Sequence, residues 1–243
     1  MHQVKRAIIM AAGTGTRMHP VTLTTPKPLV KVNGQAMIES VIEALHKNNI
    51  YEIHIVIGYL KEQFYALSEK YENLHFIENP YYDTCNNISS LYVAREYLED
   101  VIILDGDQII YDPSILKKEF NRSGYNVIYS DHETDEWVLE VDKDGLVTSC
   151  SDHGASQGWQ LYSISRWNAK DGQQLKKHLE YEFNEKQNRQ VYWDNVALLL
   201  HPQEYQLGIT PMNKNAVIEI DNFYELCAMD PSYSTYEQEE THA

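Results

Sequence analysis

A segment near the N-terminus combines glycines, hydroxyls and a basic side chain in a pattern suited to binding phosphate. It comprises Ala11, Ala12, Gly13, Thr14, Gly15, Thr16 and Arg17, and Thr25-Pro26-Lys27-Pro28-Leu29 follows it. Glycines let backbone N–H groups approach phosphate oxygens, and Arg17 and Lys27 can neutralise a triphosphate. The P-loop spacing is absent, and Met18 stands where the GxGxxG fingerprint needs its third glycine. The pattern predicts a polyphosphate cradle, with a plain strand-to-helix turn as the alternative.

An acidic motif, Asp105-Gly106-Asp107, directly follows the apolar run Val101-Ile102-Ile103-Leu104. A magnesium ion that bridges phosphates prefers one or two carboxylates and keeps several waters. We therefore predict a magnesium site here, at the end of a buried strand. A turn carrying two solvated acids is the alternative.

Aromatic residues in the second half could form a box for a quaternary ammonium group through cation–π attraction. The candidates are Trp137, Trp159, Trp167, Tyr192 and Trp193, and Glu136 and Asp194 could supply a negative charge. Core packing is the alternative for each ring, and we assign Trp159 and Trp167 to the core. Asn86 and Asn87 could hydrogen-bond a phosphate or a ribose, or could form an ordinary turn.

Composition and charge exclude several classes of protein. The formal net charge of −16 argues against a protein that binds a nucleic-acid backbone. No apolar run is long enough to cross a membrane, and the apolar stretch at the N-terminus is too short for a signal peptide. The three cysteines have no metal-type spacing and suggest a reducing compartment, so we expect a cytoplasmic protein without membrane insertion.

The first half alternates between strand-like and helix-like patterns, which predicts a mostly parallel sheet with right-handed crossovers. We expect strands at 7–10, 52–58, 75–78 and 101–104, and helices at 36–47, 61–71 and 89–98. In such a sheet, ligands bind at the carboxyl ends of the strands. The glycine segment and Asp107 both fall at strand ends, so this arrangement would bring them together.

The second half has short strands with turn signals from 126 to 147, then helix-like stretches at 173–184 and 193–200. We predict a single domain over 1–229, with a nucleotide-binding half to about residue 125 and an acceptor-binding half over 126–229. Residues 230–243 form a polar, acidic tail that we expect to be disordered or an extension.

These motifs together resemble a known enzyme superfamily. Ala11-Ala12-Gly13-Thr14-Gly15-Thr16-Arg17-Met18 with the Lys27 segment is similar to the signature of the sugar-phosphate and alditol-phosphate nucleotidyltransferases. Within it, the chain resembles the bacterial CTP:phosphocholine cytidylyltransferases. That likeness rests on Gly58-Tyr59-Leu60-Lys61-Glu62-Gln63-Phe64, Asn86-Asn87, Ser90-Leu91-Tyr92, Glu136-Trp137 and Tyr192-Trp193-Asp194-Asn195.

The resemblance implies a three-layer, Rossmann-like α/β fold whose mostly parallel mixed sheet carries a small acceptor-binding lobe. It implies Mg²⁺ at Asp107, with Glu219 or Asp221 as a later metal-binding acid, and it selects Trp137 and Tyr192-Trp193-Asp194 for the acceptor. The expected reaction joins CTP to phosphocholine and releases pyrophosphate. In it the Gly13 loop and Arg17 hold the triphosphate, Lys27 stabilises the charge of the transition state, and Asp107 places magnesium on the α-phosphate. Two alternatives remain, namely another acceptor (2-aminoethylphosphonate, a sugar 1-phosphate or a polyol phosphate) and a catalytically silent nucleotide-sensing subunit.

Overall fold

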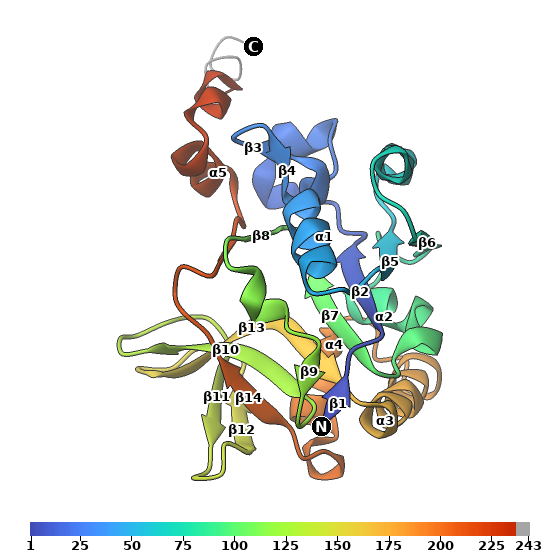
Figure 1. Cartoon of the computed structure of the whole chain (residues 1–243), viewed down its shortest axis with the longest axis vertical. Helices are drawn as coiled ribbons and strands as arrows, with labels where there is room; N and C mark the ends of the chain where they lie inside the picture. The colour runs from blue at the N-terminus through green and yellow to red at the C-terminus, as the bar shows by residue number, and fades with distance from the viewer. Residues whose placement is uncertain (237–243) are drawn as a thin grey trace.

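The computed structural model describes residues 1–236, and its centre is a nine-stranded mixed sheet. Seven strands follow the order β12-β11-β13-β7-β2-β5-β6, and β10 and β14 pair beside β13 (Figure 1). Four neighbouring strands are parallel: β2 (Arg6–Ala11), β5 (Glu52–Ile57), β6 (Leu74–Glu78) and β7 (Val101–Asp105). The carboxyl ends of β2 and β7 therefore lie side by side, as the sequence predicts.

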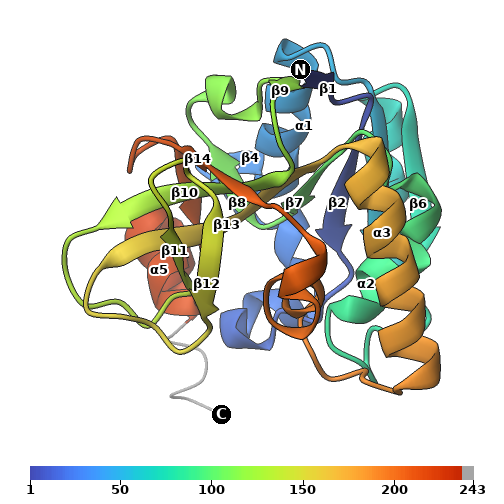
Figure 2. The same cartoon turned by 90° about the horizontal axis from the view of Figure 1, so that it is seen from below.

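Both faces of this parallel region are covered by helices. Along β2, Ile9 packs in a cluster with α1 (Met37–Lys47), whereas Ile8 packs on the other side with α2 (Ile88–Val93) and α3 (Ala169–Glu180). Figures 1 and 2 show α1 on one side of the sheet and α2 with α3 on the other. A strand buried on both faces reads as a continuous apolar run, because side chains on both faces must be apolar. The predicted three-layer α/β fold is confirmed.

Two of the predicted helices differ in form from the expectation. Residues Lys61–Glu69 form a 3₁₀-helix, and α2 is short and is followed by a 3₁₀ turn at Arg95–Tyr97. In the first segment the buried side chains are Phe64 and Leu67. Residues three apart lie on the same side of a 3₁₀-helix, so this pair fits its period.

A smaller lobe extends from the long strand β13 (Gly158–Trp167), which belongs to both parts of the sheet. Its last residues pair with β7, and Trp159 pairs with Leu139 of β11 (Val138–Val141). On its other edge β13 pairs with β10 (Gly124–Ser130), and β10 pairs with β14 (Gly208–Pro211). β12 (Val147–Ser151) completes the lobe. The lobe is thus continuous with the central sheet.

Short elements complete the frame. β1 (His2–Gln3) pairs with β9 (Glu119–Phe120), β3 (Lys31–Val32) pairs with β4 (Gln35–Ala36), and β8 (Gln108–Ile110) pairs with β15 (Val217–Glu219). α4 (Trp193–Asn195) runs directly into a π-helical turn at Val196–Leu200. Within residues 1–236, no helix has the length and apolar character needed to cross a membrane.

The C-terminal segment folds back onto the loops near the N-terminus. α5 (Phe223–Met229) buries Phe223 and Leu226 in a cluster with Met18 and Met37. A 3₁₀-helix at Pro231–Thr235 follows, and the Tyr233 hydroxyl donates to the Lys31 carbonyl at 2.7 Å. The first residues of the expected polar tail thus form a short helical extension that contacts the loop at Lys31. Residues 237–243 lie outside the described part of the chain.

Candidate active site

A cleft of about 460 Å³ opens at the carboxyl ends of β2 and β7. The smaller lobe built on β13 forms its other side. Most of the predicted site residues line it: Ala11, Ala12, Gly13, Gly15, Arg17, Lys27, Asn87, Asp107, Glu136, Trp137, Tyr192, Asp194, Glu219 and Asp221. Residues far apart in the sequence thus meet in one cavity. Thr14, Thr16, Asn86 and Trp193 are not among the lining residues.

Gly15 holds the glycine loop in a shape that other residues disfavour. Its φ is +65°, and a Cβ built there would lie 2.9 Å from the Lys27 Cβ and 3.1 Å from the Thr22 Cγ2. The Thr22 hydroxyl donates to the Gly15 carbonyl at 2.8 Å and fixes the turn. Because no atom lies within 4 Å of a Cβ built on Gly13, the backbone there stays open for close approach. The loop and Lys27 are therefore packed together as one unit.

The two basic residues of the cleft are paired with acids. Lys27 Nζ lies 2.5 Å from Asp107 Oδ2 and 3.1 Å from Asp221 Oδ1, and Arg17 Nη2 lies 2.9 Å from the same Asp221 oxygen. Burial lowers the pKa of Lys27, but the charges and hydrogen bonds of Asp107 and Asp221 outweigh it and raise that pKa overall. Lys27 is consequently a fixed positive charge, whereas the Arg17 side chain is largely exposed.

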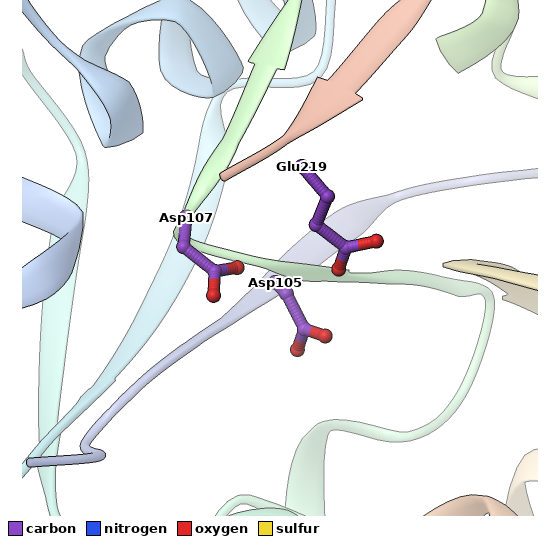
Figure 3. A group of neighbouring side chains, drawn as sticks. All are labelled: Asp105, Asp107 and Glu219. Carbon is purple, nitrogen blue, oxygen red and sulfur yellow. The ribbon is translucent and has the colours of Figure 1, made fainter. Parts of the chain in front are cut away.

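Three acids form a tight group in the cleft: Asp105, Asp107 and Glu219, with ligand oxygens all within 4.8 Å of one another (Figure 3). Asp105 ends β7, and the pairing of Glu219 with Gln108 brings β15 beside Asp107. Burial raises the pKa values of Asp105 and Glu219, and the nearby charge of Asp107 raises them further. The three carboxyl groups therefore resist ionising together unless a cation neutralises them.

This group has the chemistry of a divalent-cation site. Asp107 Oδ1 is buried and has no hydrogen-bond partner within residues 1–236, and Lys27 is the one cation that directly contacts an acid of the group. Oxygen ligands crowded in this way suit Mg²⁺, which favours carboxylates. Asp221, a predicted ligand, lies outside the group and pairs with Arg17 and Lys27 instead.

The end of the cleft expected to bind the acceptor combines two rings with one buried acid, Asp194, and one exposed acid, Glu136. Trp137 and Tyr192 meet edge to face with ring centroids 5.8 Å apart. Asp194 is buried, and burial raises its pKa to about 7, although the Tyr125 hydroxyl partly offsets this. Burial also raises the pKa of Glu136, and the charge of Asp221 adds to the effect. This end can therefore bind a positively charged group.

The structure places the remaining predicted residues behind the cleft or beside it. Trp193 is only 1% exposed, and its ring packs near Tyr125 and Trp167 in the core. Asn86 bonds to the backbone of the loop that precedes Tyr192. Thr14 and Thr16 belong to the glycine turn, and neither side chain lines the cavity. Trp193 thus differs from the acceptor role expected of it, because its side chain faces away from the cavity.

Sequence reasoning missed two kinds of cleft residue. From the Asp105-Gly106-Asp107 motif the resemblance selects only Asp107 as a metal ligand, whereas Asp105 also belongs to the acid group. Ser163 and Leu161 on β13 also line the cleft. Period-two alternation along a strand could have placed these two on one face, had the strand been recognised.

A larger cavity of about 750 Å³ lies elsewhere, beside Arg166 and Asn126. Arg166 is buried and bonds there to the carbonyl oxygens of Ile115 and Lys117 and to the Asn126 amide, which ties a turn to β13. Those bonds account for the arginine in structural terms. The motif residues all gather in the smaller cleft, which we therefore take as the active-site candidate.

Comparison with known families supports this choice. The family model for the MobA-like NTP transferase domain matches residues 7–173. The chain belongs to the MobA-like NTP transferase family. Its matched region begins at β2 and includes the glycine loop, Lys27 and the Asp105–Asp107 motif.

Two curated relatives of this MobA-like chain are cytidylyltransferases. A 2-aminoethylphosphonate cytidylyltransferase of Lancefieldella rimae is 39% identical over 229 residues, covering 93% of this chain and 92% of the relative. A choline-phosphate cytidylyltransferase of Streptococcus pneumoniae is 33% identical over 217 residues, covering 89% and 93%. The chain is therefore a member of the cytidylyltransferase group of nucleotidyltransferases, as the resemblance implies.

Two solved structures share the fold of this chain. The CTP:phosphocholine cytidylyltransferase from Streptococcus pneumoniae matches with a TM-score of 0.88 and 32% identity, over 95% of this chain and 99% of that one. An inositol-1-phosphate CTP transferase from T. maritima matches with a TM-score of 0.72 at 17% identity, over 96% and 94%. At that identity the second match supports the fold alone.

Proposed function

We propose that the protein transfers the cytidylyl group of CTP to a small acceptor that carries both a phosphonate or phosphate group and a positively charged amine. The favoured acceptor is 2-aminoethylphosphonate. The observation that carries this choice is the excess of acids over rings: besides the acids of the metal group, Asp135, Glu136, Asp152 and Asp194 line the cleft, against the rings of Trp137 and Tyr192.

A primary ammonium group has three N–H donors, which carboxylates can accept. A quaternary ammonium has no N–H donor and relies on aromatic faces. These acids can accept hydrogen bonds from the ammonium N–H groups. The rings of Trp137 and Tyr192 would surround a quaternary ammonium only in part. The sequence alone favours phosphocholine, but this arrangement favours the primary amine. The relative with 39% identity, which acts on 2-aminoethylphosphonate, supports the same choice.

Phosphocholine is the second candidate, because the edge-to-face pair of Trp137 and Tyr192 could bind a trimethylammonium group. The choline-phosphate relatives and the structural match support it. Both candidates undergo the same transfer at an anionic phosphorus group. They differ in whether that group is a phosphonate or a phosphate ester, and in whether the nitrogen is a primary or a quaternary ammonium.

In the proposed reaction an oxygen of the acceptor's phosphonate or phosphate attacks the α-phosphorus of CTP. A new P–O bond forms as the bond to the β-phosphate oxygen breaks, and pyrophosphate leaves with that electron pair. The glycine loop and Arg17 would bind the triphosphate, and Lys27 would stabilise the charge that develops. Asp105, Asp107 and Glu219 would hold Mg²⁺, which when bound neutralises phosphate charge.

Pyrophosphate release tests this proposal directly. The protein is incubated with CTP, Mg²⁺ and either 2-aminoethylphosphonate, phosphocholine, glucose 1-phosphate or no acceptor. We expect the highest kcat/KM with 2-aminoethylphosphonate and only background release without an acceptor. A higher value with phosphocholine would select the second candidate. Turnover with the sugar phosphate alone, or with none of the acceptors, would contradict both.

A further inference from the structure

We propose that Asn87 has two roles at the acceptor end of the cleft, an inference that rests on the proposed function. Its side-chain carbonyl positions the segment that carries Tyr192 and Asp194. Its side-chain amide donates N–H groups to an anionic oxygen of the acceptor's phosphonate or phosphate. The neighbouring Asn86 has only a structural role.

Hydrogen bonds join the loop at 84–87 to the loop at 189–193. The Asn86 backbone N–H donates to the Arg189 carbonyl at 2.8 Å, and its side-chain amide donates to the Gln190 carbonyl at 3.2 Å. The Gln190 side chain donates in return to the Thr84 carbonyl at 2.8 Å. These three hydrogen bonds therefore join the two loops.

The Asn87 contact occurs at the centre of the acceptor wall. The backbone N–H of Trp193 donates to Asn87 Oδ1 at 2.8 Å. Tyr192 and Asp194, on either side of that peptide, both line the cleft, while the Trp193 ring is buried in the core. Asn87 Oδ1 thus fixes the backbone from which both cleft side chains project.

This contact also determines which way the Asn87 amide faces. The Trp193 N–H can only donate, so the atom opposite it must be the oxygen of Asn87. The nitrogen is then the other end of the amide, and within residues 1–236 it has no hydrogen-bond partner. Asn87 itself lines the cleft and is partly exposed there. Its two N–H donors are therefore available to a ligand.

An anionic group needs such donors at this end. Arg17 and Lys27 are the only cations among the described residues that line the cleft, and both are paired with Asp221. The acceptor end is dominated by acids, which repel a phosphonate oxygen. Neutral N–H donors let the anionic group bind without cancelling the charge that attracts the ammonium group.

Asn86 provides a matched comparison, because both ends of its amide are already occupied. Its Oδ1 accepts from the Asn87 backbone N–H at 2.7 Å, and its Nδ2 donates to Gln190 as described. It does not line the cleft. The same substitution at these neighbouring positions changes the net charge equally, but only one removes donors from the cavity.

The first experiment compares Asn87→Asp with Asn86→Asp. Aspartate keeps the oxygen that accepts from Trp193 and removes the N–H donors. We expect the KM for 2-aminoethylphosphonate to rise about 10- to 100-fold in Asn87→Asp, the scale of lost hydrogen bonds to a charged group, with the KM for CTP little changed. The KM in Asn86→Asp should rise less than about threefold, because the variant loses one of the hydrogen bonds that join the two loops and keeps the others. An unchanged acceptor KM in Asn87→Asp, or equal rises in both variants, would overturn the donor role.

The second experiment tests positioning with Asn87→Leu, which removes both the carbonyl and the amide. The readout is the ratio of kcat/KM for 2-aminoethylphosphonate to that for ethylphosphonate, which lacks the ammonium group. We expect Asn87→Asp to keep this ratio and Asn87→Leu to lose most of it, because Tyr192 and Asp194 are no longer held. A ratio in Asn87→Leu equal to that of the unaltered protein would overturn the positioning role. If the unaltered protein transfers no cytidylyl group, the proposed function fails instead.

Discussion

The two ends of the cleft are built in different ways. At the nucleotide end, Gly15 and Lys27 come from one stretch of chain and pack directly against each other. At the acceptor end, Asn87, Trp137 and Asp194 come from three distant segments held together by loop contacts. The nucleotide end is therefore built from one continuous segment, whereas the acceptor end is built from three separate segments. Changes at the first end should therefore affect catalysis as a whole, and changes at the second should affect acceptor choice.

The charges differ in the same way. The cations at the nucleotide end already contact Asp107 and Asp221. Asp194 at the acceptor end is buried without a cationic partner among the described ion pairs, and one of its oxygens has no hydrogen bond. A buried acid without a cationic partner is costly, and a bound ammonium group would offset that cost.

The largest effect is expected from Lys27→Ala. Loss of one charge-stabilising donor should lower kcat by about 10²-fold or more, with every acceptor. Steady-state pyrophosphate release measures it, and Lys61→Ala, which removes an exposed ion pair with Glu78, is the control. A fall in kcat with only one acceptor would mean that Lys27 acts on the acceptor and not on the nucleotide. The two ends of the cleft would then not differ in the way described.

Asp194→Asn should mainly affect the acceptor. Removing the charge that attracts the ammonium group should raise the KM for 2-aminoethylphosphonate by about 10-fold, on the scale of a charged hydrogen bond. The KM for CTP should stay near that of the unaltered protein. The same variant should be more stable at pH 8, because a buried charge is removed. A lower melting temperature at pH 8 would contradict this account of Asp194.

Gly15→Ala should act at the nucleotide end alone. The left-handed backbone disfavours alanine by roughly 1–2 kcal/mol, and its Cβ would meet the Lys27 Cβ. We expect a several-fold rise in the KM for CTP and a lower melting temperature. Gly34→Ala is a matched control, because Gly34 also has a positive φ but no atom lies within 4 Å of a Cβ there. If both variants raised the KM for CTP equally, the contact between a Cβ at position 15 and Lys27 would not be the reason for the rise in Gly15→Ala.

The smallest expected effect is a dependence of acceptor binding on pH. The pKa of Asp194 is raised to about 7, so its charged fraction grows as the pH rises from 6 to 8. The KM for 2-aminoethylphosphonate should therefore fall over that range, and Asp194→Asn should remove most of the change. Because the pKa of Asp194 is raised from 3.8 to about 7 in the folded protein, stability should fall as the pH rises from about 4 to about 7, where only the unfolded chain ionises this group, and should level off above that. A rise in KM over the same range would exclude Asp194 as the acid that binds the amine.

The parallel half of the fold could be predicted because each element has a local signal. Ile8 and Ile9 lie in a run too apolar for an exposed strand, and Ile38, Val41, Ile42 and Leu45 recur at helical spacing. The position of Asp107 in the site could be predicted from its place directly after an apolar strand. The position of Glu219 could be expected only from the family resemblance, because its approach to Asp107 depends on the pairing of β8 with β15, which no local pattern encodes.

The acceptor end was harder to predict because neighbouring residues there face in different directions. Tyr192 and Asp194 line the cleft, whereas Trp193 between them is buried in the core. Such facing depends on a short helical turn and on its contact with Asn87. A sequence motif marks the segment but does not say which of its side chains meets the ligand.

The pairing of β15 with β8 has a consequence for how the protein is made. A nascent chain that has emerged only through β14 already contains the glycine loop, Lys27 and Asp107. It lacks Glu219, Asp221 and α5, which packs over the turn at Met18. Asp105 and Asp107 are therefore synthesised well before Glu219. The cleft gains its full set of charges only near the end of synthesis.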